Sequence, residues 1–136
     1  MKMNSPATTS VACALVAVAS LCTSCESDSG SLNGCSTFED HTASQSLVVD
    51  FGGALGLVYS PSCARIKVNT RITFNGSFAI HPLQAHNGDA GNPFPTTAIA
   101  AGTTQEITAT VTGSFGYWCQ IHGPTSGMQG AIEVVQ

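Results

Sequence analysis

The sequence FGYWCQIHGPTSGMQGAIEV, residues 115–134, places a thiol, an imidazole and a thioether within ten residues of one another. These groups belong to Cys119, His122 and Met128. The residues on either side predict that one strand enters this segment and another leaves it. Copper that cycles between Cu(I) and Cu(II) favours one thiolate and two imidazoles in a trigonal arrangement, with a weak axial thioether. One short loop can therefore supply three of the four ligands of a copper site.

The remaining ligand, a second histidine, has to come from a distant part of the chain. The segment SFAIHPL, residues 77–83, is an apolar alternation that ends in His81, and a strand is a rigid base for a metal ligand. His86 is the alternative, but it lies among Asn and Gly residues that predict a loop. His41 follows two acidic residues and is expected at the surface. The pattern favours His81.

The fold expected around this segment is an all-β Greek-key sandwich. Alternation of apolar and polar residues with a period of two predicts strands at residues 46–51, 64–68, 71–74, 106–111 and 131–135. Turn signals rich in Gly, Asn and Pro separate these runs, and no internal repeat or amphipathic helix interrupts them. Residues 83–97 are expected to form a long loop with at most one helical turn. Residues 45–136 are the predicted folded domain.

Composition excludes several classes of function. The chain has 136 residues, which is enough for one domain, and only 9% of them are charged. Four Lys and Arg residues cannot form a nucleic-acid interface, so no nucleic-acid partner is expected. We find no Ser-His-Asp spacing and no phosphate loop, and a fully coordinated metal leaves no position for a substrate, so the protein is not expected to be an enzyme.

Residues 1–24 have the form of an export signal. Lys2 precedes an apolar run of 12 residues, 11–22, which is too short to cross a bilayer as a helix. Cleavage after the small-x-small site at residues 17–19 releases a soluble protein, whereas the segment ending in Cys25 resembles a loose lipobox and predicts a lipid anchor there. Residues 25–44 are then a polar N-terminal segment. Both alternatives place the protein outside the cytoplasm, in the periplasm, on a membrane as a lipoprotein, or in the medium.

Three cysteines remain in the region that is expected to fold, namely Cys35, Cys63 and Cys119. Two of them should pair in an oxidising compartment, which leaves one thiol. The turn residues around Cys35 and Cys63 favour a disulfide between these two. The alternative is a Cys63–Cys119 pair, because Tyr117 and Cys119 have the spacing of an immunoglobulin tyrosine corner.

Together these residues resemble the small blue-copper proteins of the cupredoxin family, and are most similar to the plastocyanin-like bacterial members. The resemblance covers residues 45–136 and is concentrated in the aromatic-Cys119-x-x-His122 motif, in Met128 with the strand that follows, and in His81. It implies one type 1 copper ion with His81, Cys119 and His122 as equatorial ligands and Met128 as the axial ligand. Five residues separate His122 from Met128 where plastocyanins usually have four, so Gln129 remains an alternative axial ligand.

The resemblance also implies the function, which is transfer of single electrons between transient protein partners by a monomer. Partners are expected to dock where an edge of His122 reaches solvent, beside Phe94, Gly123, Pro124 and Gly127. Trp118 points away from Cys119 and is expected in the core or as a cover for the site. Pro82 stands where the family usually has a backbone N–H donor to the thiolate, which predicts a lowered reduction potential. Copper carriage or storage, and a metal-free immunoglobulin-like binding module, are the alternative functions.

Overall fold

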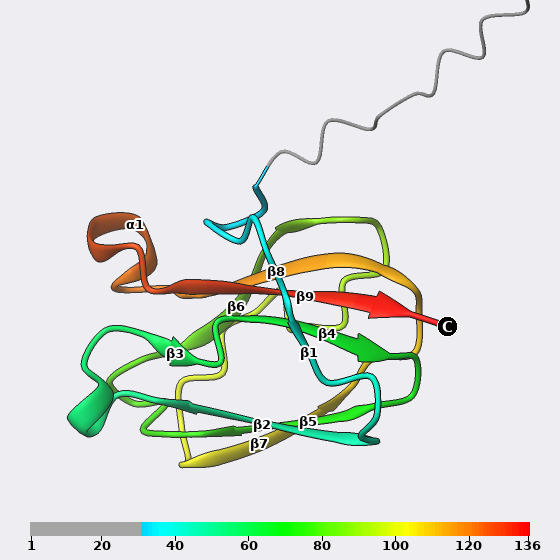
Figure 1. The fold of residues 1–136 in the computed structure, drawn as a ribbon. Coiled ribbons are helices and arrows are strands. Elements are labelled where there is room, and N and C mark those ends of the chain that lie inside the picture. Colours follow the sequence, from blue (N-terminus) through cyan, green and yellow to red (C-terminus); the bar gives the residue numbers. More distant parts are fainter. Residues whose placement is uncertain (1–30) are drawn as a thin grey trace, which may run out of the picture.

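The computed structural model describes residues 31–136, which form two β-sheets packed face to face (Figure 1). One sheet has the order β1-β4-β9-β8-β6, with β1 (Glu39–Asp40), β4 (Cys63–Lys67), β9 (Gln129–Val135), β8 (Gly113–Cys119) and β6 (Leu83–Gly88). The other has the order β3-β2-β5-β7, with β3 (Tyr59–Ser60), β2 (Ser46–Phe51), β5 (Arg71–Asn75) and β7 (Thr104–Thr108). Two short helices, η1 (Gly53–Leu55) and α1 (Gly123–Ser126), complete the elements. The expectation of an all-β sandwich is confirmed.

The sandwich forms because alternate residues of its strands are apolar and share one buried face. Along β2 exposed and buried residues alternate without exception, and the same pattern brings Ile72 and Phe74 of β5 into the core. Aromatic rings fill the centre, where Tyr117 of β8 meets Phe74 edge to face at a centroid distance of 5.1 Å. Strand β8, which ends at Cys119, is therefore fixed on its inner face by a dense aromatic core.

Two local predictions were wrong in the segment that leads into β6. Residues 77–81 form a turn rather than a strand, because the N–H groups of Ile80 and His81 both donate to the carbonyl of Ser77, at 3.2 and 2.9 Å. Residues 83–88 form strand β6 rather than the start of a long loop. The pairing of β6 with β8 shifts register between Ala85 and Gly88, and this irregularity together with polar residues hides the strand in the sequence.

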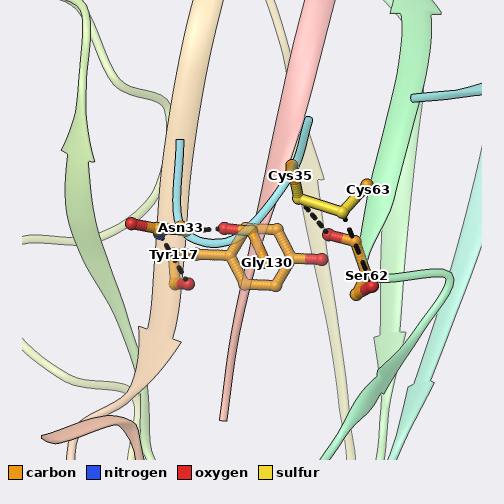
Figure 2. Close-up of a disulfide and its surroundings, with 6 residues drawn as sticks. All are labelled: Asn33, Cys35, Ser62, Cys63, Tyr117 and Gly130. Carbon is orange, nitrogen blue, oxygen red and sulfur yellow. Dashed lines mark hydrogen bonds between the residues drawn. A yellow bond between two sulfur atoms is a disulfide. The ribbon is translucent and has the colours of Figure 1, made fainter. Parts of the chain in front are cut away.

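The N-terminal part of the described chain is fastened to the five-stranded sheet. Strand β1 pairs in parallel with β4, and a disulfide joins Cys35 to Cys63, which confirms the pairing expected from the turn residues. The alternative Cys63–Cys119 disulfide is thereby excluded, and Cys119 is the free cysteine among residues 31–136. Figure 2 shows the disulfide at the edge of β4, close to Ser62. The proposed export signal lies outside the described residues, and within them no helix has the length and apolarity to span a membrane.

Candidate metal centre

Three side chains expected to bind a metal come together at one end of the sandwich. Cys119 is the last residue of β8, His122 follows in the loop that contains α1, and His81 lies in the turn before β6 (Figure 1). The two His Nδ1 atoms lie 3.1 Å apart. The Cys119 Sγ atom lies 3.4 Å from Nδ1 of His122 and 4.0 Å from Nδ1 of His81. His81 is 38 positions from Cys119 in the sequence and His122 is 3 positions from it, yet both rings face the thiol.

The size of this cluster fits a metal ion. A triangle with sides of 3.1, 3.4 and 4.0 Å has a centre about 2.1 Å from each corner, which is the length of a metal–imidazole bond and slightly below the roughly 2.3 Å of a metal–thiolate bond. One thiolate with two imidazoles is a donor set suited to copper. The geometry is that of a site able to hold one ion between three atoms.

The loop between β8 and β9 returns Met128 to the side of Cys119. The N–H of Cys119 donates to the carbonyl of Met128 at 2.9 Å, so the two ends of the loop are closed on each other. Inside the loop, the N–H of Ser126 donates to the carbonyl of His122 at 2.8 Å, and Gly127 ends α1 in a left-handed conformation with φ of 67°. Met128 is fully buried and contacts His81. The single turn of helix therefore bends the chain so that Met128 returns to the side of Cys119 and His81.

Gln129, the alternative to Met128, has a different environment. It is only half-buried, and its side-chain amide lies beside Gly34 of the N-terminal segment. Met128, by contrast, lies just before the first residue of β9 and is fully buried.

The ring of His81 is held by packing from β2 and its following turn. His81 is 7% exposed, and its ring contacts that of Phe51 edge-on at a centroid distance of 6.1 Å. Burial, with a smaller contribution from the neighbouring His122, lowers the pKa of His81 and favours the neutral ring that binds metals. A Cβ at Gly52 would lie 2.9 Å from Cδ2 of this ring. The sequence around Gly52 indicates only a turn, because the contact with His81 joins segments 29 positions apart.

The Cys119 thiol lies in a dry environment with one backbone donor. Its side chain is fully buried, and the N–H of His122 donates to its Sγ at 3.4 Å. Pro82 lies against the same part of the chain, since its carbonyl accepts the N–H of Gln120 at 2.8 Å, but it has no N–H to offer the sulfur. A metal cation bound at this sulfur would offset the cost of burying a thiolate.

The other candidate residues lie outside the cluster. His86 stacks on Trp118 with ring planes 3° apart and centroids separated by 3.6 Å, and burial lowers its pKa. His41 is paired with Glu39 at 3.0 Å. Trp118 is half-buried and covers Gly123 of α1, where a Cβ would meet its ring. Phe94 was expected beside the exposed edge of His122; instead it is buried against Tyr117, with ring centroids 4.7 Å apart.

Gly52→Ala is expected to weaken metal binding without unfolding the protein. The added methyl group would overlap the ring of His81, and the backbone at residue 52 has φ of 71°, which alanine adopts poorly. We expect a loss of affinity of about 10- to 100-fold, as for other residues that orient a metal ligand. A chelator competition titration measures this, with Gly53→Ala as control, since residue 53 also has a positive φ but open space at the Cβ position. Equal affinities of the two variants would contradict the role of Gly52.

Comparison with known proteins finds likeness at the level of structure. No family model and no curated protein matches the sequence. A Cu-containing nitrite reductase from Thermus scotoductus is 25% identical with a TM-score of 0.52, over 66% of this chain but only 22% of the reductase. Pseudoazurin from Methylobacterium extorquens is 20% identical, with a TM-score of 0.51 over 65% of this chain and 74% of that one. Plastocyanin from Dryopteris crassirhizoma is 15% identical, with a TM-score of 0.50. The match covers 65% of this chain and 99% of the plastocyanin.

Proposed function

From the premise that this chain has the cupredoxin fold, we propose that it holds one copper ion between His81, Cys119, His122 and Met128 and carries single electrons between proteins. The observation that carries the proposal is the convergence of one thiol and two imidazole nitrogens around a common centre. Bound there, copper supplies a one-electron couple between Cu(I) and Cu(II). Met128 rather than Gln129 would be the fourth residue to hold the ion in this proposal, because it is buried beside His81 while Gln129 lies by the N-terminal segment.

The protein contributes rigidity and exclusion of water. Cys119 sits at the end of a strand whose inner face is packed in the aromatic core, and the hydrogen bond from its N–H to Met128 closes the loop. His81 is held between the Phe51 ring and Gly52. Because these supports do not depend on the charge of the ion, the ligands need to move little when that charge changes. His122 is the least buried of the four residues and is the natural point of electron entry and exit.

Partners are proposed to dock at this end of the sandwich by apolar contact. The segments that surround the site, residues 51–62, 76–88 and 115–132, contain no Lys, Arg, Asp or Glu. Ile80 and Ile121, the neighbours of the two histidines, are 59% and 53% exposed. A small uncharged surface suits brief encounters between redox proteins, since neither strong attraction nor a large buried area delays separation. The protein acts as a monomer in this proposal.

Export is the proposed route to the site of action. The Cys35–Cys63 disulfide requires an oxidising compartment, in agreement with the signal-like residues 1–24. The periplasm is the proposed location, with the chain either soluble or anchored through a lipid on Cys25. A mass spectrum of the exported protein distinguishes the two forms, because an acylated Cys25 adds the mass of its lipid.

An electron carrier is favoured over an enzyme or a copper carrier. The match to the nitrite reductase covers only 22% of that protein, so its reaction gives no ground for assigning catalysis here. Copper carriage needs a site that releases its ion readily, whereas three of the four proposed ligands lie in well-buried positions. Slow transfer of Cu(I) to a chelator, compared with fast exchange of electrons, would separate the two functions.

The function is tested by titrating the metal-free protein with Cu(II). One equivalent is expected to produce an intense visible absorption band from the thiolate–copper bond. Ascorbate should bleach this band and ferricyanide should restore it over repeated cycles. A colourless complex, or reduction accompanied by loss of copper, would contradict the proposed role.

Pro82→Asn is expected to raise the reduction potential of the copper site. The substitution supplies a backbone N–H at the position where the resemblance to cupredoxins implies a donor to the thiolate, and a donor dipole favours the more electron-rich Cu(I) state. A difference of about 1 kcal/mol, typical of one hydrogen bond, corresponds to a rise of roughly 40 mV for a one-electron couple. Voltammetry measures the midpoint, with Pro95→Asn as control because Pro95 contacts Ala85 rather than the site. An unchanged or lower midpoint in Pro82→Asn would refute the effect.

A further inference from the structure

A tight turn in the N-terminal segment presents one asparagine to the five-stranded sheet. Asn33 and Gly34 both have positive φ, 51° and 80°, and the N–H of Cys35 donates to the carbonyl of Leu32 at 2.9 Å across the turn. Asn-Gly is the preferred pair for such a turn. The disulfide of Cys35 then fixes the turn to β4. The turn bond and the disulfide together fix the position of the Asn33 backbone.

The amide of Asn33 contacts three strands at once. Its Nδ2 atom lies 3.0 Å from the carbonyl oxygen of Gly130 in β9, 3.3 Å from that of Tyr117 in β8 and 3.0 Å from that of His86 in β6. Figure 2 shows the amide over β8 and β9, with its bonds to Tyr117 and Gly130. A Cβ on Gly116 would collide with the amide, so a glycine in β8 makes room for it.

These contacts lie at the base of the loop that carries three of the proposed ligands. Tyr117 and Gly130 are paired partners in the β8–β9 ladder. Tyr117 precedes Cys119 by two residues and Gly130 follows Met128 by two. The third strand, β6, begins two residues after His81. One side-chain amide thus binds together the three strands that lead to all four proposed ligands.

The hydrogen bond from Asn33 to the His86 carbonyl also supplies a donor to an irregular stretch of backbone in β6. The register shift at residues 85–88 displaces carbonyl groups from the ladder with β8, and such groups need other donors. Asn33 donates to His86, and Asn92 donates to the carbonyls of Asn87 and Gly116 at 3.0 and 2.9 Å. Without Asn33, the edge strand nearest His81 would lose one of these links.

We propose that Asn33 is a positioning residue of the metal centre, which sets the spacing of β6, β8 and β9 where the ligands emerge. The inference rests on the proposed copper function. Loss of the amide lets the base of the ligand loop open, so that Cys119 and Met128 are held less firmly against His81. The hydrogen bond from Cys119 N–H to the Met128 carbonyl is the first contact that this opening would break.

The substitution Asn33→Gly tests the positioning role of Asn33. It removes the side-chain amide but keeps the backbone conformation, because glycine adopts positive φ freely. Asn69→Gly is the matched control. Asn69 has φ of 69° in the turn between β4 and β5, at the end of the sandwich opposite α1 (Figure 1). Both variants add one glycine at a turn, but only Asn33→Gly removes bonds to the ligand-bearing strands.

The first measurement is amide hydrogen exchange in the metal-free protein. In Asn33→Gly we expect the Cys119 amide to exchange about 10-fold faster relative to the Ile72 amide of β5, whereas Asn69→Gly should leave this ratio unchanged. The second measurement is copper release from the copper-loaded protein. Asn33→Gly should release copper to a chelator about 10-fold faster, which is the lower end of the 10- to 100-fold loss of affinity seen when a residue that orients metal ligands is removed. The substitution should also shift the thiolate–copper band.

Either of two results would overturn the role of Asn33. The first is equal behaviour of Asn33→Gly and Asn69→Gly. The second is faster amide exchange throughout Asn33→Gly with an unchanged thiolate–copper band, which would mean that Asn33 stabilises the whole fold and does not position the ligands. Absence of a band in the unaltered protein would instead count against the copper function. The exchange ratio of the metal-free variants would still report whether Asn33 holds the loop.

Discussion

Replacing Cys119 by serine is expected to abolish the thiolate–copper absorption band completely. The band requires a sulfur–copper bond, and Cys119 is the free cysteine of the described chain. Serine has nearly the same shape, but its hydroxyl is a far weaker copper ligand at neutral pH than a thiolate. Removal of outer contacts already costs about 10- to 100-fold in affinity, so loss of this ligand should weaken copper binding by more than about 100-fold.

The control for this experiment is His86→Gln. His86 is stacked on Trp118 outside the cluster, so this variant should keep the band. The metal-free Cys119→Ser protein should still fold, with a stability loss of about 1–3 kcal/mol for a buried hydroxyl whose hydrogen bonding is incomplete. A folded Cys119→Ser protein with an unchanged band would show that the thiol does not bind the metal.

Removal of the disulfide by the double substitution Cys35→Ala and Cys63→Ala is expected to cause the largest loss of stability. The bond joins residues separated by 28 positions, and closing such a loop contributes about 3–4 kcal/mol through the entropy of the unfolded chain. It also fixes the turn that carries Asn33, so its loss acts on the native state as well. Urea unfolding of the metal-free protein measures the free energy of unfolding directly.

Dithiothreitol provides an internal control for this prediction. It should destabilise the unaltered protein and leave the double variant unaffected, because the variant lacks the disulfide that the structure shows within residues 31–136. A decrease of less than about 1 kcal/mol in the double variant would contradict the estimate. It would mean that strand β1 and the contacts of Asn33 hold the N-terminal segment without the covalent link.

The loop between β8 and β9 could be predicted from sequence because its three residues with metal-binding side chains lie within ten residues of one another. Thiol, imidazole and thioether residues stand between two strand patterns, and a loop of this length brings its ends together once the strands pair. Of the two candidate histidines, His81 lies with the thiol and His86 does not, but the reason given for His81 was wrong. It lies in a turn stabilised by the Ser77 carbonyl and not at the end of a strand. Apolar alternation at residues 77–80 reflects packing of Phe78 into the core.

Strand β6 could not be predicted because its alternation is broken. Leu83 is buried, but the register shift after Ala85 places His86 and Asn87 outside the regular ladder, and Asn87 has φ of 60°. Asn and Gly residues at such a shift are normally taken as signs of a loop. The strand exists because β8 provides a partner, which is a contact between distant segments and not a local preference.

The contacts of Asn33 and Gly52 could not be predicted from the sequence for a related reason. Each depends on one side chain, or the absence of one, meeting a segment far away in the chain. Their local sequences, Asn-Gly and Gly-Gly, indicate turns and carry no sign of what the turn faces. The sequence thus identifies the residues with metal-binding chemistry, while the residues that hold them in place emerge only from the fold.

X-ray absorption at the copper edge of the loaded protein tests the central claim most directly. We predict one short sulfur ligand and two imidazole nitrogens, the latter about 2.0–2.1 Å from a single ion. Coordination by nitrogen and oxygen alone, or two sulfur ligands of equal length, would contradict a site built on Cys119, His81 and His122.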